Sequence, residues 1–308
     1  MKKLFLFVLC LINVLLLVTG VYAEEKIVSG DYEIIVQEDG TAKITDYKGM
    51  DEVLTVPAEI SGYRITSIGL WAFNGSNNIT SLILQEGLTS IGECAFFGCR
   101  NLTSVSIPQS TTSIDMGAFG DCVNLEKIIV SPDNPTFATI DNVLFNKETK
   151  SLIAFPAAKQ TSEYIVPQGI TSIEGCAFLN CKNLKSITLP ESLTSIGQEA
   201  FEDCTNLEEI NLPEGLTSIE YGTFIGCKNL TSINLPEGLT SIEEDAFWNC
   251  ENLTSINLPD SLTSIGENAF DGCEDITFIV NRESNTREWV IDNGYNYTYP
   301  DANNWLNN

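Results

Sequence analysis

The sequence predicts a repeat solenoid, in which coils of 23 residues stack on one another and share an apolar core. Two regular spacings predict this fold. Phenylalanine recurs every 23 residues in two runs, at Phe73, Phe96 and Phe119 and again at Phe178, Phe201, Phe224, Phe247 and Phe270. Cysteine recurs three positions after phenylalanine, at Cys99, Cys122, Cys181, Cys204, Cys227, Cys250 and Cys273. A fixed period of this length indicates units that cannot bury an apolar face alone and are stabilised by their neighbours.

A single unit, residues 230–251, shows how each coil is expected to fold. Apolar residues such as Ile233 alternate with polar ones, which predicts a short strand that ends at Pro236. Residues 244–249 are expected to form a short helical turn that directs Phe247 into the core. The asparagine that recurs at the return corner is expected to be buried, because its amide can satisfy backbone groups of the coils on either side.

The repeated pattern is Leu-x-x-Ile-x-Leu-Pro followed by Leu-x-x-Ile-x-x-x-Ala-Phe-x-x-Cys-x-Asn. It resembles the BspA-type leucine-rich repeats of secreted and surface proteins of bacteria and of some mucosal protozoa, and the resemblance covers roughly residues 53–280. It implies a leucine-rich repeat superhelix of the α/β horseshoe class, rich in β-structure, with a parallel sheet, short helical turns and a cap at each end. It also implies adhesion or protein binding for some members, and no known role for most.

Four segments are expected along the chain. Lys2 and Lys3 precede an apolar run over residues 4–18 and a small-x-small site that ends at Ala23, so residues 1–23 are expected to be a signal peptide that is cleaved before Glu24. An uncleaved membrane anchor is the alternative, which Asn13 and the short run disfavour. Residues 24–52 are expected to form an N-terminal β cap, residues 53–282 the solenoid, and residues 283–308 the C-terminal cap.

One coil is 13 residues longer than the others, at about residues 132–166. Two apolar runs, 143–145 and 152–155, flank a polar segment there and predict an inserted hairpin. In the strands on either side, Ile129 and Ile165 occupy outward positions where other coils carry Ser, Thr or Asn. Two explanations remain open: the insert covers the two isoleucines, or they form a binding patch.

Composition excludes several kinds of site. The formal net charge is −26 and there is no histidine. Such a chain repels phosphate backbones, so no nucleic-acid partner is expected. Catalytic pairs that use histidine and histidine-ligated zinc are excluded, and no cofactor or metal is expected. The repeat cysteines are expected to form a row of buried free thiols, because side chains that point the same way from stacked coils do not meet in disulfides.

The first functional hypothesis is therefore a secreted or cell-surface protein, not an enzyme, that binds a protein or glycoprotein ligand through a concave sheet. It is expected to be a monomer without stable membrane insertion. The candidate ligand-binding residues are the unusual outward residues near the long coil and their neighbours: Lys127, Ile129, Glu163, Ile165, Thr188, Glu209 and Asn211. The alternatives are an extracellular carbohydrate-active enzyme that uses paired carboxylates, with Glu208 and Glu209 among the densest acidic runs, and a passive structural spacer.

Overall fold

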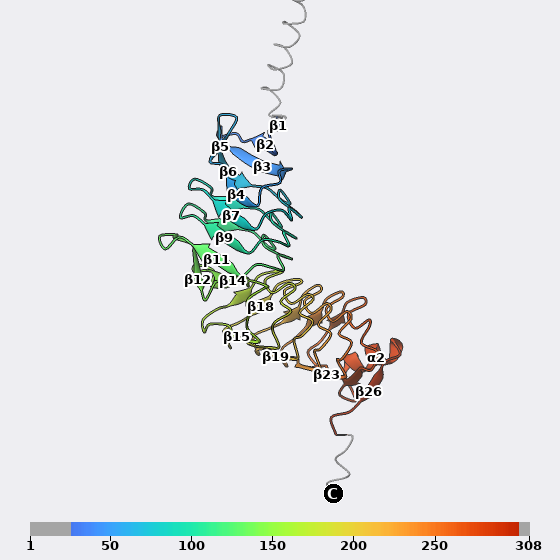
Figure 1. Ribbon diagram of the computed structural model, residues 1–308. Coiled ribbons are helices and arrows are strands. Elements are labelled where there is room, and N and C mark those ends of the chain that lie inside the picture. The colour runs from blue at the N-terminus through green and yellow to red at the C-terminus, as the bar shows by residue number, and fades with distance from the viewer. Residues whose placement is uncertain (1–25, 302–308) are drawn as a thin grey trace, which may run out of the picture.

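A computed structural model describes residues 26–301, and the expected signal peptide lies outside them. The chain winds as a β-solenoid of about 11 turns, and Figure 1 shows the turns stacked along a bent path with the first and last described strands at opposite ends. The 23-residue spacing, the parallel sheets and the leucine-rich-repeat-like fold agree with the sequence prediction.

The longer strands of the turns make two parallel sheets, which we call the long-strand sheets. The first has the order β11-β9-β7-β4 and the second the order β15-β17-β19-β21-β23-β25-β26. The strands of the first are β4 (Val53–Val56), β7 (Ser81–Leu84), β9 (Ser104–Ile107) and β11 (Lys127–Val130). Those of the second are β15 (Glu163–Ile165), β17 (Ser186–Thr188), β19 (Glu209–Asn211), β21 (Ser232–Asn234), β23 (Ser255–Asn257), β25 (Thr277–Ile279) and β26 (Asn296–Thr298).

A second series of strands, each of two residues, repeats the dipeptide Ser-Ile on another side of the coils. Its members are β8 (Ser90–Ile91), β10 (Ser113–Ile114), β16 (Ser172–Ile173), β18 (Ser195–Ile196), β20 (Ser218–Ile219), β22 (Ser241–Ile242) and β24 (Ser264–Ile265). At the N-terminal end β8 pairs with β6 (Tyr63–Ile68), which also pairs antiparallel with β5 (Glu59–Ile60). The isoleucines of this series face the core, because side chains alternate across a strand.

The repeated phenylalanines stack on one another in two separate columns. Ring centroids of consecutive members lie 4.8 and 5.8 Å apart from Phe73 to Phe119, and between 5.0 and 5.4 Å from Phe155 to Phe270. Within each column the phenylalanine N–H donates to a carbonyl of the next coil, as from Phe73 to Ala95 at 2.8 Å. No such bond leaves Phe119 among the described residues, so the ladder is interrupted there.

The turns around these phenylalanines are not helical, which corrects the sequence prediction. The residue two positions before each phenylalanine from Phe73 to Phe119 and from Phe178 to Phe270 has a φ of +52° to +64°, and the residue two positions after it has a φ of +52° to +80°. Two left-handed residues per turn are incompatible with an α-helix, since L-residues in a helix keep φ negative. The slots hold Gly, Asn or Asp in many coils, but Trp71, Cys94 and Glu199 also occupy them.

Replacing one of these strained residues should stabilise the fold. Glu199 has a φ of +55°, which costs a residue with a Cβ about 1–2 kcal/mol and costs glycine almost nothing. We expect Glu199→Gly to raise the free energy of unfolding by about 0.5–1 kcal/mol, after the greater flexibility of glycine in the unfolded chain is subtracted. Urea denaturation would measure it. The neighbouring control Gln198→Gly, which relieves no left-handed strain, should lower stability instead, and equal effects of the two changes would contradict this explanation.

The repeat cysteines are buried and free, as the sequence predicts. Most of them have a specific partner: the thiol of Cys99 donates to the carbonyl of Phe73 in the preceding coil at 3.2 Å, and Cys122, Cys204, Cys227, Cys250 and Cys273 repeat this contact. A cysteine is small enough for the corner and satisfies a carbonyl there. The repeated asparagines, by contrast, are exposed rather than buried, although the amide of Asn101 does reach the preceding coil, at Asn77 O.

The long coil contains a three-stranded antiparallel meander, β12 (Phe137–Ile140), β13 (Val143–Asn146) and β14 (Ser151–Ala154). β13 and β14 form a hairpin, and β12 adds a third strand to it. The meander separates two apolar cores: Leu144 and Ile153 pack into the N-terminal one, and Phe145 and Leu152 into the C-terminal one. The insert is therefore a layer between two stacks of coils, which we call the N-terminal stack (residues 26–130) and the C-terminal stack (residues 155–301).

Both ends of the chain carry elements that differ from the repeat. At the start, β1 (Lys26–Ser29), β2 (Tyr32–Val36) and β3 (Ala42–Tyr47) form an antiparallel meander, and β3 then pairs parallel with β6. At the end, helix α2 (Asn285–Asp292) begins after Ser284, whose side chain accepts a hydrogen bond from Arg287 N. Its Val290 is completely buried in the core of the C-terminal stack. We propose that these segments cap the stacks, because they cover coils that have a neighbour on one side only.

Candidate functional site

The candidate residues lie on the exposed side of the long-strand sheets, where they form rows. On the second sheet, Ile165, Thr188 and Asn211 are register partners on β15, β17 and β19. Glu163, Ser186 and Glu209 form the parallel row beside them. Five of the seven predicted residues therefore lie together on three neighbouring strands, and all five are exposed.

Lys127 and Ile129 belong to β11, the edge strand of the other long-strand sheet. β15, which carries Glu163 and Ile165, is the edge strand of its own sheet. The structure thus divides the predicted residues between two sheet edges, because β11 and β15 are not paired with one another. The meander between the two cores accounts for this interruption of the long-strand sheets.

The exposure of the two isoleucines rules out one of the explanations left open by the sequence, that the insert covers them. The residue Ile129 is 40% exposed and Ile165 is 69% exposed. The meander therefore does not cover them. An exposed isoleucine alone is ordinary on a protein surface. Two of them at the edges of an interrupted sheet, on a face built mainly from Ser, Thr and Asn, mark the place where this surface differs from the regular repeat.

Sequence reasoning missed further apolar residues on the same face of the N-terminal stack. Ile83 of β7 is 40% exposed, and Val53 of β4 is 61% exposed. Ile83 and Ile129 are both register partners of Ser106, on either side of it. The period-2 alternation within β7 and β4 could have shown both residues, since each occupies an outward position.

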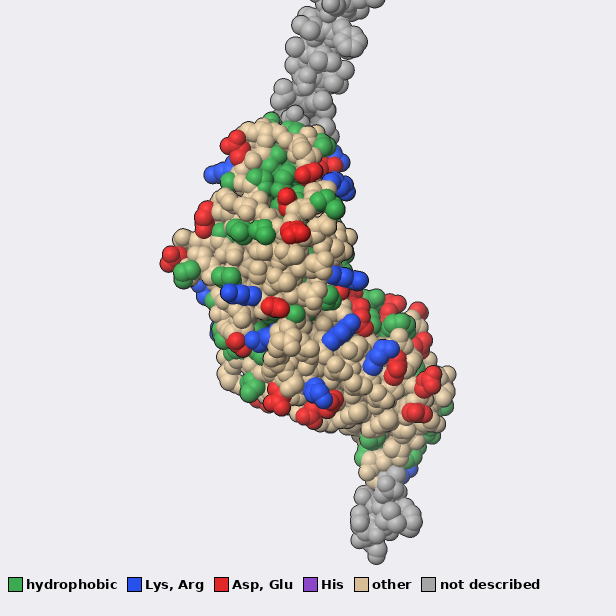
Figure 2. Space-filling model, viewed as in Figure 1, with side chains coloured by type: hydrophobic (Ala, Val, Ile, Leu, Met, Phe, Trp, Pro, Cys, Tyr) green, Lys and Arg blue, Asp and Glu red, His purple; other side chains and the backbone are tan. Residues whose placement is uncertain are grey.

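Acidic side chains dominate the C-terminal stack. Residues 186–281 contain 18 Asp and Glu and one Lys, and Figure 2 shows acidic side chains gathered along the coils of this half. One carboxyl is strongly perturbed: burial, together with the charges of Glu199, Asp203 and Asp121, raises the pKa of Glu202 to about 7. Glu202 lines none of the hollows described below, and no sequence signal had singled it out.

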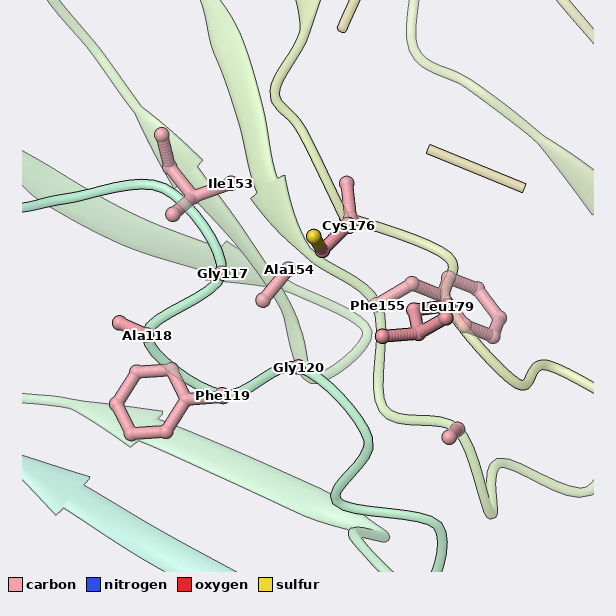
Figure 3. Close-up of a pocket in the computed structure, with 11 residues that line it drawn as sticks. Gly117, Ala118, Phe119, Gly120, Ile153, Ala154, Phe155, Cys176 and Leu179 are labelled. Carbon is pink, nitrogen blue, oxygen red and sulfur yellow. The ribbon is translucent and has the colours of Figure 1, made fainter. Parts of the chain in front are cut away.

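The hollows of the molecule include one very small cavity and two larger depressions that are open to the surface. Between the two stacks lies a cavity of about 10 Å³, lined by Phe119, Ala154 and Cys176 among others, which is room for one water molecule (Figure 3). Two open depressions follow the Ser-Ile strands, one of about 680 Å³ beside β6 and β8 and one of about 560 Å³ beside β16 and β18. Within residues 26–301 no group of three or more Cys, Asp or Glu is arranged to hold a metal ion.

The family model that matches the chain is the BspA type leucine rich repeat region, in six copies, over residues 59–161 and 151–277. The chain belongs to this family. Proteins of this repeat family are typically non-catalytic. The two matched stretches overlap at β14, where the structure passes from one stack to the other. Among curated proteins no sequence matches this chain.

Several solved structures share the fold of this BspA-type repeat protein. A leucine rich cell surface protein of Faecalibacterium prausnitzii A2-165 is 25% identical with a TM-score of 0.56, over 88% of this chain and 98% of that chain. A leucine-rich repeat protein of Bacteroides ovatus ATCC 8483 is 24% identical with a TM-score of 0.51, over 89% of this chain and 67% of that chain. The pneumococcal vaccine antigen PcpA is 19% identical with a TM-score of 0.53, over 90% and 98%.

The described residues contain no helix that is long and apolar enough to cross a membrane.

Proposed function

We propose that this repeat protein acts outside the cell or at its surface, and binds a protein or glycoprotein ligand through the long-strand face near the boundary of the two stacks. The observation that carries the proposal is the pair of exposed isoleucines, Ile129 and Ile165, at the two edges of the interrupted sheet. Specific interfaces concentrate their binding energy in a few apolar, aromatic or Arg anchors, and the rows of Ser, Thr and Asn elsewhere on this face provide none.

The surrounding residues suit a protein ligand better than a small one. Glu163 and Glu209 on one side and Lys127 on the other provide charges of both signs beside the apolar anchors. Thr188 and Asn211 offer exposed hydrogen-bonding groups in register with Ile165. The face is open, whereas small ligands bind in enclosed sites. The Faecalibacterium relative is a cell surface protein, which supports the proposed location.

A double substitution tests the proposal. The ligand is first identified as the protein that the purified chain retains from extracts of host matrix or bacterial envelope. We expect the double variant Ile129→Asp, Ile165→Asp to lose binding to this ligand, because unpaired carboxylates buried at an interface are costly. Immobilised-protein binding measured with that ligand would show the loss. Ser255→Asp, an outward substitution on β23 far along the same sheet, is the matched control and should bind normally.

Thermal unfolding separates binding from folding. Both isoleucines are exposed, so the double variant should keep a melting temperature within a few degrees of the unmodified protein, as surface substitutions usually do. Undiminished binding by a folded double variant would reject the site.

The enzyme alternative has one observation in its favour, the raised pKa of Glu202, since a general acid in glycoside hydrolysis needs such a carboxyl. Such an enzyme also needs a sugar subsite beside the acid, and Glu202 lines none of the three hollows described above. We therefore propose binding rather than catalysis.

A further inference from the structure

We propose that the ligand segment held at this site is an extended, basic peptide strand that adds to the free edge of β15. This inference rests on the proposed function and specifies the mode of binding and the chemistry of the partner.

The backbone N–H and C=O groups of β15 point alternately toward β17 and toward the opposite edge of the strand. Along a strand in a parallel sheet, the N–H and C=O of alternate residues point to opposite neighbours. Val166 N donates to Thr188 O at 3.0 Å, and Lys185 N donates to Ser162 O at 2.7 Å. Residues 162, 164 and 166 therefore face β17, and residues 163 and 165 face the other way.

The opposite edge of β15 has no strand partner among residues 26–301. At Glu163 the local chain partly satisfies the free backbone groups, because Thr161 Oγ1 donates to Glu163 O at 2.6 Å. At Ile165 no described strand pairs on this side, and its outward N–H and C=O have no hydrogen-bond partner among the described residues. A free edge of this kind is a template for a further strand, and protein domains use it to bind extended peptides.

The partner can be deduced from the side chains at this edge. Ile165 is 69% exposed, so an added strand would place an apolar residue beside it. Glu163 is exposed and makes no ion pair with the described residues, so the position beside it favours Lys or Arg. The 18 acidic residues and one Lys within residues 186–281 attract a basic segment over a longer range.

A second copy of this chain is a less suitable partner for the β15 edge. A second copy of the same chain would bring another acidic C-terminal stack against the first, and like charges repel.

The probe for the test is a synthetic peptide of alternating Lys and Val, with blocked ends. We expect it to bind the full chain at least tenfold more tightly than the same peptide with N-methylated valines, which cannot complete the backbone hydrogen bonds. An alternating Glu and Val peptide should also bind at least tenfold more weakly. Equal binding of the methylated and unmethylated peptides would overturn strand addition.

A proline substitution tests the edge itself. Ile165→Pro removes the outward N–H and leaves the bonds from residues 162, 164 and 166 to β17 in place, since proline is tolerated on an edge strand. We expect it to reduce affinity for the Lys-Val peptide at least tenfold, whereas Ile165→Thr, which keeps the N–H, should reduce it less. Circular dichroism on both variants would verify the fold.

Amide hydrogen exchange gives a readout that needs no substitution. On peptide binding, exchange at the Ile165 N–H should slow at least tenfold, while exchange at the Tyr164 N–H, already directed to β17, should change little. Unchanged exchange at Ile165 in the bound protein would overturn the proposal. So would a dimer of the free chain that Ile165→Pro converts to a monomer, because a second copy would then occupy the edge.

The proposed function and the strand-addition proposal can be rejected independently of each other. A captured ligand that is lost with the Ile129→Asp and Ile165→Asp double variant, but is bound normally by Ile165→Pro, supports the proposed function and rejects strand addition. A Lys-Val peptide that binds through the edge when no extract yields a ligand at this face would reject the proposed function.

Discussion

Residues 137–308 should fold on their own as a cooperative unit. In the structure the meander β12–β14 covers the first coil of the C-terminal stack, and Phe155 directly after it stacks on Phe178 with ring centroids 5.0 Å apart. All three ladders of the solenoid are interrupted at this place: β11 does not pair with β15, β10 does not pair with β14, and Phe119 N–H has no bond to the next coil. Few hydrogen bonds would therefore be lost if the chain before residue 137 were removed.

The N-terminal end of the protein shows why the meander can serve as a cap. There, β1, β2 and β3 also form an antiparallel meander, and its last strand pairs parallel with the next coil at β6, just as β14 pairs with β16. The Tyr47 ring packs against Phe73 at a centroid distance of 5.0 Å, tilted by 34°, and Phe155 stacks on Phe178 at the same distance. The interior meander therefore has the same arrangement as the proposed N-terminal cap.

The comparison fragment is residues 162–308, which lacks the meander. It should lose its cooperative thermal transition, because its first coil would expose core residues such as Phe178 and Ile173, each worth roughly 1.5–3 kcal/mol of burial. Differential scanning calorimetry on both fragments would measure this. Leu144→Thr with Ile153→Thr should make the 137–308 fragment more soluble, since these side chains face the missing N-terminal core. Equal melting of the two fragments would contradict the role of the meander.

Much of this organisation was accessible from the sequence, because a solenoid repeats each local contact in every turn. The 23-residue spacing of the phenylalanines predicted that the coils stack, and the alternation of apolar and polar residues predicted that Ile129 and Ile165 point outward. One available signal was overlooked: Ala154-Phe155 lies 23 positions before Ala177-Phe178 and marks the first coil of the second stack. The continuous apolar run at residues 143–145 was a second signal, since strands buried on both faces lack alternation.

Other features had no clear sequence signal. The left-handed positions of the turns are obscured wherever residues such as Trp71, Cys94 or Glu199 occupy them, because these residues seldom adopt a positive φ. The positions of the Cys94 and Cys176 thiols, both of which a Cβ on Gly117 would meet, depend on how the two stacks pack together. The division of the candidate site between two sheet edges depends on the same junction, which the meander sets through packing of both its faces.

Alkaline pH should unfold the protein at values where most globular proteins remain folded. Burial raises the pKa of the Cys99 thiol to about 12, and burial likewise raises the pKa values of Cys122, Cys181, Cys227 and Cys250 well above the ordinary range. A thiol in an unfolded chain titrates near 8.5. Above that pH the unfolded state loses protons that the folded state keeps, so the free energy of unfolding falls as pH rises.

The expected effect is large because the thiols act together. Each loses about 1.4 kcal/mol per pH unit between its unfolded and folded pKa, so five of them together remove on the order of 10 kcal/mol by pH 10. That is comparable with the total stability of a typical domain. Urea denaturation at pH 7, 8, 9 and 10 would measure how steeply the free energy of unfolding falls with pH. Below pH 8 the thiols are protonated in both states, so their contribution to this free energy should be constant.

A serine variant isolates the contribution of the thiols. Serine does not titrate in this range and can donate to the phenylalanine carbonyls that Cys99, Cys122, Cys227 and Cys250 contact. Ser76 already occupies the corresponding position in the first coil. Replacing the five cysteines by serine should therefore flatten the fall in stability between pH 8 and 10, whatever it does to stability at pH 7. An equally steep fall in the serine variant would show that other groups, such as Tyr32 with its pKa raised by burial to about 12, cause the alkaline unfolding. A flat profile in the unmodified protein would show that the thiols are not titrated on unfolding, as disulfide-bonded cysteines would not be.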